Sequence, residues 1–443
     1  MTQPSDARRK HPAGLTMSAI VRFWLPLVAS WLLMTAELPA VNALVARMSE
    51  AKLQLAAFGV AYSLALAVES PIISQLTAGN ALARNRDSFH LLRRFMLGLN
   101  VLLTVLMLVL SLTPLFDLVV VRFLGAPLGV AARVRPTLWA LTLWPAAIGY
   151  RRFHQGVMIR YGYTRQVSYG TAVRLLTSVG VAALGLFWGK LGGATVGGLA
   201  LGTATLAEAA FIHYLSRPAV RQVKKTAPST DDPPLTLRAL LGFYSPLALT
   251  SIISLSTAPL VNFGLARSPY PLASLAAWPV VNGQLLLLRS FGFSLQEVVV
   301  ALLDGPAIKE TLRRFAVILG IISLALLLIV AFTPLGPWWQ RQIAGLSEEL
   351  TAFAVPALQL AVLLPVLAVV QSWLRGVLIT GQATGAIARA TVLNLFVLMA
   401  VLLAGGRLGW LPGASVAPIA LTASQVAGLL WMWHSAHSAR RRP

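Results

Sequence analysis

The chain of 443 residues contains no cysteine, and only 11% of its residues are charged. The absence of cysteine excludes disulfide bonds and thiolate metal sites, and it leaves the redox compartment open. Soluble domains carry about 25% charged residues, so the shortage of charge excludes an ordinary soluble protein. Short strands of alternating polarity are also missing, which excludes a membrane β-barrel. The composition therefore predicts an all-α polytopic membrane protein, because a helix satisfies its own backbone polar groups in lipid.

Long apolar runs make up most of the sequence, which is 57% hydrophobic and has a mean hydropathy of +0.74. Each run is long enough to cross about 30 Å of hydrocarbon. We count twelve predicted transmembrane helices, at residues 20–46, 54–79, 91–114, 134–158, 167–188, 194–215, 240–266, 274–300, 311–333, 352–378, 387–404 and 414–434.

The sequence also lacks the motifs of several enzyme classes. No Walker sequence is present, so ATP hydrolysis is not the expected energy source. No cluster of His, Asp and Glu in the predicted spans has catalytic or metal-ligand spacing. We therefore expect no enzymatic activity, no metal and no cofactor, with H⁺ or Na⁺ as the coupling ion of a transporter.

The formal net charge of +22 raises the question of nucleic-acid binding, but its distribution argues against it. Of the 36 Lys and Arg residues, 25 fall on the side of the two termini, among them Arg151, Arg152, Arg174 and Arg375. Nine fall on the opposite side, and two lie in or at the edge of spans. The positive-inside rule therefore predicts a multi-pass protein of the cell inner membrane with both termini in the cytoplasm. The expected partners are the lipid bilayer and a small-molecule substrate, with no nucleic acid, and the expected state is a monomer.

The sequence aligns with itself at an offset of 220 residues without a gap. RFWLPLVASWLLMTAELPAVNALVAR (22–47) aligns with GFYSPLALTSIISLSTAPLVNFGLAR (242–267), which keeps proline, asparagine and arginine in register. Six spans in each half make this a parallel repeat, with two similar lobes related by an axis along the membrane normal. The predicted regions are a cytoplasmic N-terminus at 1–19, an N-lobe at 20–216, a cytoplasmic linker at 217–239, a C-lobe at 240–435 and a basic tail at 436–443.

Two Gly- and Ala-rich stretches, GGATVGGLALGTA (192–204) and PGASVAPIALTAS (412–424), enter the sixth span of each half and resemble those of the MATE-like (MOP) transporter superfamily. Within it, VRFWLPL (21–27), LAAFGVAYSLALAVESP (55–71) and FHQGVMIRYGY (153–163) are similar to the progressive ankylosis protein family, here as a bacterial-type homologue. The resemblance implies two six-helix lobes around a central cleft lined by spans 1, 2, 7 and 8. It also implies export of anions such as citrate, ATP or pyrophosphate. Where the family leads us to expect basic residues, this chain has Leu255 and Ala258.

A carboxylate stands inside the first span, although a charge at mid-bilayer costs at least about 2.5–3.5 kcal/mol. Glu37 is followed by Pro39 and Asn42, and the second repeat keeps Pro259 and Asn262 but not the acid. Proline frees backbone carbonyls one turn earlier, so both prolines are predicted helix kinks. A carboxylate beside freed carbonyls suits H⁺ or Na⁺, which makes Glu37 and Asn42 candidates for ion coupling. The alternative is a neutral Glu that hydrogen-bonds to a neighbouring helix.

Glu69 and Arg289 occupy equivalent positions of the repeat in spans 2 and 8. Facing each other, they could form a gate, or Arg289 could hold an anionic substrate; snorkelling to the headgroups is the alternative for the arginine. Polar residues on the predicted cleft helices complete the candidates for substrate contact: Tyr62, Asn262, Asn282 and Gln284.

The leading functional hypothesis is a secondary-active exporter that works by alternating access of two lobes. Its substrate would be an organic or phosphate-bearing anion, coupled to H⁺ or Na⁺. A MATE-type multidrug or cation antiporter and a lipid-linked oligosaccharide flippase are the alternatives. A membrane-embedded enzyme is disfavoured by the lack of a catalytic cluster and by the tandem duplication.

Overall fold

The computed structural model describes residues 16–227, 234–303, 305–380 and 384–440, so parts of the predicted N-terminus, linker and tail lie outside it. Every regular element in these ranges is a helix. The first repeat forms α1 (Met17–Val45), α2 (Ala51–Glu69), η1 (Ser70–Ser74), α3 (Gln75–Leu82), α4 (Arg86–Leu112), η2 (Asp117–Phe123), α5 (Leu128–Ala140), α6 (Trp144–Arg160), α7 (Thr164–Trp188) and α8 (Gly193–Lys225). The second forms α9 (Leu237–Leu255), α10 (Thr257–Ala266), α11 (Pro271–Leu302), α12 (Gly305–Phe332), α13 (Leu335–Trp338), η3 (Trp339–Ile343), α14 (Glu348–Leu360), α15 (Leu364–Thr380), α16 (Thr384–Leu408) and α17 (Gly413–Arg440).

Ten of the described helices are long and apolar enough to cross a membrane, or eleven if the bent pair α14–α15 counts as one span. The prediction of an all-helical protein with many spans is confirmed, but the predicted number of twelve exceeds the number that passes this test. The difference lies at 134–158, which forms α5 and α6. The second of these helices carries Arg151 and Arg152, which lower its hydropathy although Arg151 is buried inside the protein.

Several helix starts are encoded by local capping residues. The Asn85 side chain accepts from the Ser88 backbone N–H at 3.0 Å, and the Ser88 hydroxyl accepts from the Asn85 N–H at 3.0 Å, so a complete capping box begins α4. Thr236 caps α9 by accepting from the Ala239 N–H. These caps satisfy N–H groups that have no partner within the helix.

The irregular features of the first repeat recur 220 residues later, as the sequence alignment predicts. The break between α5 and α6 has its counterpart between α14 and α15, which meet at 42°. The π-helical segments η2 and η3 are followed by Gly125 and Gly345, with φ of 73° and 74°. A left-handed backbone at both sites favours glycine, which has no Cβ to clash.

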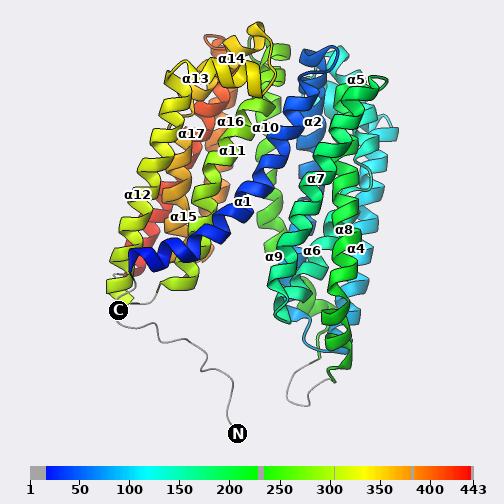
Figure 1. The fold of residues 1–443 in the computed structure, drawn as a ribbon, viewed down its shortest axis with the longest axis vertical. Helices are drawn as coiled ribbons and strands as arrows, with labels where there is room; N and C mark the ends of the chain where they lie inside the picture. Colours follow the sequence, from blue (N-terminus) through cyan, green and yellow to red (C-terminus); the bar gives the residue numbers. More distant parts are fainter. Residues whose placement is uncertain (1–15, 228–233, 304, 381–383, 441–443) are drawn as a thin grey trace.

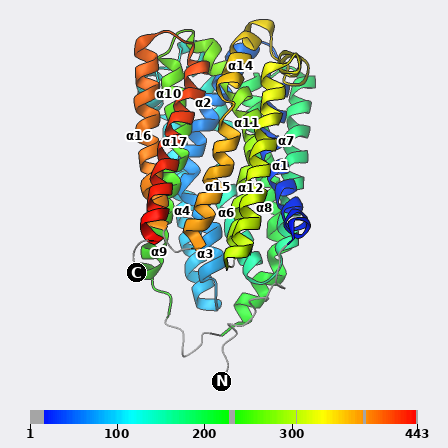
Figure 2. The same ribbon diagram turned by 90° about the vertical axis from the view of Figure 1, so that its left-hand side faces the viewer.

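The first helix of each repeat crosses from one lobe to the other (Figure 1). The early part of α1 packs on α11 and α12, where Trp24 donates to the Ser294 hydroxyl at 2.8 Å. The early part of α9 packs on the N-lobe in turn, where the Tyr244 hydroxyl donates to the Pro71 carbonyl at 2.6 Å. The remaining lobe helices stand side by side, as Figure 2 shows for α12, α15, α17 and α16 of the C-lobe.

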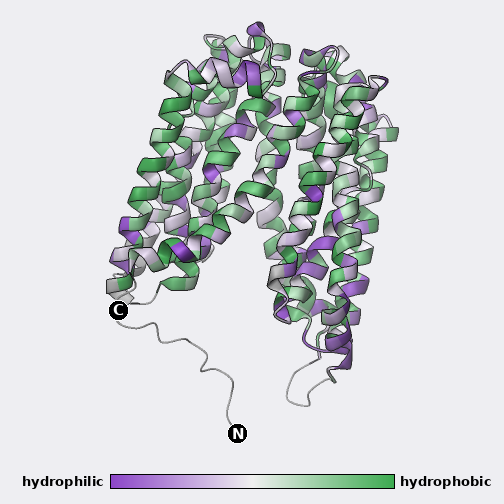
Figure 3. Cartoon of the chain, viewed as in Figure 1, coloured by the Kyte–Doolittle hydropathy of each residue, from purple (hydrophilic) through white to green (hydrophobic). Residues whose placement is uncertain are grey.

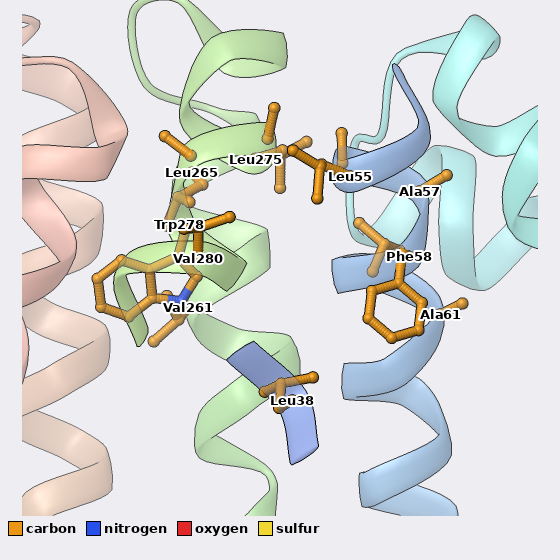
Figure 4. Close-up of a cluster of buried hydrophobic side chains, with 14 of the residues drawn as sticks. Leu38, Leu55, Ala57, Phe58, Ala61, Val261, Leu265, Leu275, Trp278 and Val280 are labelled. Atoms are coloured by element: carbon orange, nitrogen blue, oxygen red, sulfur yellow. The ribbon is translucent and has the colours of Figure 1, made fainter. Parts of the chain in front are cut away.

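The two lobes meet at one end and diverge toward the other (Figure 1). An apolar cluster from α1, α2, α10 and α11 seals the meeting end, with Leu38, Phe58, Val261 and Trp278 buried in it (Figure 4). We call this the closed end and the opposite one the splayed end. The start of α1, the end of α17 and the long basic extension of α8 lie toward the splayed end (Figure 1).

Candidate functional site

The N-lobe contains a buried network of acids and arginines. Glu37 on α1 accepts two hydrogen bonds from Arg174 on α7, at 3.1 Å from Nε and 2.5 Å from Nη2. Arg174 Nη1 lies 3.9 Å from Glu208 on α8, and Glu208 accepts from Arg151 on α6 at 2.9 Å. Glu37 is 6% exposed and Glu208 is fully buried. The carboxylate that the sequence marks as an ion-coupling candidate is therefore one partner of a bidentate ion pair.

Glu69 belongs to the same lobe but has no ion-pair partner among the described residues. It is buried, and its Oε2 atom has no hydrogen-bond partner there. The charges that act on it most are those of Arg152, Arg151 and Arg174, in that order. Neither Glu69 nor Arg289 forms an ion pair with a described residue, so the two do not form the gate pair in this conformation. With Glu69 included, three carboxylates of the N-lobe are balanced by three guanidinium groups.

A cavity of about 460 Å³ lies between the lobes, directly below the apolar cluster of the closed end. α2 contributes one wall with Tyr62, while the C-lobe supplies most of the polar surface. That surface carries Asn282 and Arg289 on α11 and Arg375 on α15. None of the described residues that line the cavity is a carboxylate, and Leu255 and Ala258 are part of its wall.

Arg289 and Arg375 are the two charged side chains that line this cavity. Neither forms an ion pair with any described residue, and the buried Nε atom of each lacks a hydrogen-bond partner there. The guanidinium of Arg289 stands 5.5 Å from the centre of the Phe293 ring, and Arg375 is the charged group that acts on it most. Two neighbouring cations without counter-ions are costly in a membrane protein unless an anion accompanies them.

Alignment of the two repeats shows where the positive charge of the cavity comes from, because equivalent positions carry side chains of different charge in the two lobes. Positions of the N-lobe network and their C-lobe equivalents are Glu37 and Thr257, Glu69 and Arg289, Arg151 and Gln371, Arg152 and Ser372, Gln155 and Arg375, Arg174 and Asn394, and Glu208 and Gly428. The C-lobe thus has none of the three carboxylates and none of the three arginines at these positions, but it carries two arginines at positions where the N-lobe has Glu69 and Gln155. The same duplicated fold therefore holds a charged network with no net charge in the N-lobe and a cavity with net positive charge in the C-lobe.

The two asparagines of the repeat bind the lobes together. Asn42 donates to the Pro279 carbonyl of α11 at 2.9 Å, and Asn262 donates to the Gly59 carbonyl of α2 at 3.2 Å. Gly59 and Pro279 are themselves 220 residues apart, so the two contacts are symmetric. Both lie beside the closed end, where a Cβ on Gly59 would come within 2.4 Å of the Pro279 ring.

The other predicted residues divide between the cavity and the protein core. Tyr62, Asn262 and Asn282 line the cavity. Gln284 does not, because it exchanges two amide hydrogen bonds with Gln340, at 2.8 and 3.2 Å. Of the predicted kinks, the helix is interrupted at Ser256, between α9 and the α10 segment that holds Pro259, whereas α1 continues through Pro39.

Two further arginines join the lobes at the outer edge of the closed end. Arg47, just after α1, donates from Nη2 to the carbonyls of Gln342 at 2.7 Å and Ile343 at 3.1 Å. Arg267, just after α10, donates to the carbonyls of Phe123 at 2.6 Å and Leu124 at 2.8 Å. Each guanidinium thus binds the end of the π-helical segment in the opposite lobe, where carbonyls lack helical partners. We call Arg47 and Arg267 the latch arginines.

Replacing both latch arginines with alanine is expected to favour separation of the lobes at the closed end. Each arginine makes charge-assisted bonds that contribute about 1.5–3 kcal/mol when well formed, so their loss raises the population of the opened state. Spin labels on cysteines placed at Leu128 and Trp410, which are exposed on opposite lobes, report this distance by double electron–electron resonance. The chain has no native cysteine to remove first.

The matched control for this measurement is Arg133→Ala, since Arg133 pairs with Glu50 inside the N-lobe. That variant should keep the distance distribution of the parent protein. A Leu128–Trp410 distribution that is unchanged in the Arg47→Ala/Arg267→Ala variant contradicts the latch role.

The same architecture occurs in several solved structures. A multidrug resistance MATE family transporter of the MOP superfamily, in an inward-facing conformation, matches with a TM-score of 0.63 at 12% identity over 92% of this chain and 96% of that one. The lipid II flippase MurJ, in an inward closed conformation, matches with a TM-score of 0.69 at 13% identity over 95% of this chain and 87% of that one. A MOP superfamily transporter from Pyrococcus furiosus, described as having a binding pocket of reverse polarity that suggests a different function, matches with a TM-score of 0.62 at 14% identity over 96% and 97%.

These likenesses confirm the predicted MATE-like (MOP) fold. The three proteins are described as transporters or as a flippase, and none is described as an enzyme. No protein-family model and no curated protein matches the sequence. The likenesses do not single out the progressive ankylosis family.

Proposed function

We propose that this chain, which has the fold of MOP superfamily transporters, is a secondary-active exporter of an organic or phosphate-bearing anion. The observation that carries the proposal is the pair of arginines without counter-ions, Arg289 and Arg375, in the cavity between the lobes. Guanidinium groups bind carboxylate and phosphate through parallel charged hydrogen bonds. The amides of Asn282, Asn394 and Gln425 add neutral donors to the same wall.

The charge of the cavity favours an anion over a cationic drug. A cation entering it would meet two positive groups at short range in a medium of low polarity, where repulsion is strong. An anion of charge −2 or more neutralises both arginines and completes their hydrogen bonding. This is why citrate, ATP and pyrophosphate, which the progressive ankylosis resemblance implies, remain our preferred candidates.

Transport in this proposal follows from rocking of the two lobes. The cavity lies below the sealed closed end, so the substrate enters from the splayed end, which we assign to the cytoplasm from the excess of basic residues. Opening of the closed end requires the latch arginines and the contacts of Asn42 and Asn262 to separate. These contacts recur in both repeats, so they can break together as the lobes rotate.

Ion coupling is assigned to Glu69 in this proposal, rather than to Glu37. Glu37 is fixed in a bidentate bond with Arg174, and Glu208 is bonded to Arg151. Glu69 has a buried oxygen without a partner among the described residues, so it can accept H⁺ or help to bind Na⁺ without breaking an ion pair.

Two alternatives use the same fold. A MATE-type multidrug antiporter would need a negative or neutral cavity, and the arginines oppose this. A flippase for a lipid-linked oligosaccharide is supported by the likeness to MurJ. It would also place an anionic group near Arg289 and Arg375, but it requires a lipid-bearing substrate.

Counterflow in proteoliposomes tests the proposal, with citrate, ATP, pyrophosphate and cationic dyes as substrates and with imposed pH or Na⁺ gradients. We expect uptake of at least one of the anions, stimulated by one of the gradients, and no uptake of the dyes. Uptake of cationic dyes alone contradicts the proposal. Translocation of a lipid-linked sugar with no uptake of soluble anions supports the flippase instead.

A further inference from the structure

A second cavity, of about 330 Å³, lies in the N-lobe toward the splayed end, between α4, α6 and α8. It shares no residue with the central cavity. Its lining consists of Phe89, Arg93, Tyr150, His154, His213, Ser216, Arg217, Val220, Arg221 and Lys224. We call it the basal pocket.

Four cationic side chains surround the basal pocket, and its described lining contains no carboxylate. Arg93 comes from α4, while Arg217, Arg221 and Lys224 follow one another on the extension of α8. None of the four forms an ion pair with a described residue. Figure 3 shows that hydrophilic residues concentrate at this end of the N-lobe, below the apolar surface of its helices. The pocket therefore lies where helices leave the apolar layer, at the depth of lipid headgroups.

Tyrosine and histidine side chains that hydrogen-bond to one another and to the backbone form the inner wall of the pocket. Nδ1 of buried His154 donates to the Tyr150 carbonyl at 2.8 Å, because a carbonyl oxygen can only accept, and this fixes the orientation of the ring. The Tyr150 hydroxyl is hydrogen-bonded to Nδ1 of His213. The pocket is thus a preorganised polar surface with cationic side chains at its rim.

The second repeat shows that this pocket is not a general result of basic residues at the splayed end. The C-lobe positions equivalent to Tyr150, His154 and His213 are Val370, Leu374 and Trp433. There the equivalent of Arg93, which is Arg313, pairs with Glu310 at 3.0 Å. Among the residues that the structure describes, the polar wall of the N-lobe therefore has no counterpart in the C-lobe, and the equivalent of Arg93 is paired.

We propose that the basal pocket binds a phosphate group, carried by an anionic phospholipid headgroup or by a soluble phosphate compound. Phosphate offers several acceptor oxygens, and it matches arginines and a lysine that converge from two helices. Basic pockets between helices at the cytoplasmic face of membrane proteins suit lipid headgroups in particular. Phe89 and Val220 add apolar surface that the glycerol of a lipid can contact.

The test uses the full chain carrying Arg289→Gln and Arg375→Gln, so that the central cavity does not contribute. Binding of phosphatidylglycerol relative to phosphatidylcholine is measured by native mass spectrometry, and stabilisation by inorganic phosphate is measured by thermal unfolding in detergent. Two pocket variants, Arg217→Gln/Arg221→Gln and Arg93→Gln/Lys224→Gln, are compared with the control Arg94→Gln, which changes a neighbouring exposed arginine outside the pocket.

We expect each pocket variant to weaken binding by about tenfold or more, as loss of charge-assisted hydrogen bonds implies, while Arg94→Gln binds like its parent. Selective loss of phosphatidylglycerol binding identifies a lipid site, and selective loss of stabilisation by phosphate identifies a site for a soluble compound. The proposal is overturned if the chain carrying only Arg289→Gln and Arg375→Gln binds neither probe, or if both pocket variants bind as well as the Arg94→Gln control. Because the central arginines are absent throughout, none of these outcomes depends on the proposed transport function.

Discussion

Replacing Arg289 and Arg375 together with glutamine is expected to lower anion transport at least about 100-fold, because each charged hydrogen bond to a substrate contributes about 1.5–3 kcal/mol. Glutamine keeps a polar side chain of intermediate length in the cavity, so the variant removes charge more than it removes volume. Neither arginine forms an ion pair with a described residue, so no acid is left unpaired by the change. The variant should therefore fold at least as stably as the parent, and the effect should fall on transport. Counterflow of the anion identified in the substrate panel measures it.

The control for this prediction is Arg389→Gln. Arg389 is an exposed arginine of α16, bonded to the Gly385 carbonyl and outside the cavity. We expect it to transport like the parent. Arg375→Lys should retain part of the activity, since it keeps the charge but loses the planar fork. Full transport by the Arg289→Gln/Arg375→Gln variant shows that the substrate is bound elsewhere.

Glu37→Gln is expected to cause the largest loss of stability of the single changes considered. It leaves the Arg174 guanidinium in the lobe interior with only the weaker contact to Glu208, at 3.9 Å. Breaking one side of a buried pair typically costs about 3–5 kcal/mol, because the remaining charge is uncompensated. Thermal unfolding of the purified protein in detergent measures the loss.

Two variants separate this structural role from ion coupling. Glu37→Gln combined with Arg174→Gln removes both charges, so it should regain much of the stability that Glu37→Gln loses. Glu69→Gln should unfold near the temperature of the parent but should transport without dependence on the pH or Na⁺ gradient. If Glu37→Gln is stable and uncoupled while Glu69→Gln remains coupled, the roles assigned to these two acids are reversed.

Much of the fold could be predicted from the sequence, because its determinants are local or repeated. Apolar runs of about 20 residues predict helices in lipid, and a gap-free offset of 220 residues predicts two similar lobes. The same alignment pairs Asn42 with Asn262 and Arg47 with Arg267. It could not show that these residues reach the opposite lobe, since that depends on how α1 and α9 cross between lobes.

The charged residues of the site show where sequence reasoning fails. Arg174 was counted with the basic residues of a loop, but α7 begins at Thr164, so Arg174 lies about 15 Å along that helix. Arg151 and Arg375 were counted in the same way, although one bonds to Glu208 and the other lines the central cavity. A positive-inside count assigns each basic residue to one side of the membrane from its distance along the chain to the end of a predicted span. It cannot detect an arginine whose counter-ion, or whose cavity, is formed by another helix.

The comparison of the two repeats carries the charge signal that a positive-inside count lacks. When Glu37, Glu69 and Glu208 are aligned with their C-lobe equivalents, the sequence alone shows that none of these three positions carries an acid in the second repeat. The two repeats share the residues that join the lobes, whereas they differ at the residues of the proposed substrate site. The asymmetry between the lobes, rather than any single motif, is what points to an anion.

Direct binding to the purified protein tests the central claim that the C-lobe arginines hold an anion. Radiolabelled citrate, ATP and pyrophosphate are titrated by scintillation proximity against the parent, Arg289→Gln/Arg375→Gln and Arg389→Gln, with a labelled lipophilic cation in parallel. We predict saturable binding of an anion to the parent and to Arg389→Gln, loss of that binding in the double variant, and no binding of the cation to the parent. Anion binding that survives in the double variant, or a cation that binds the parent more tightly than every anion, would contradict the account.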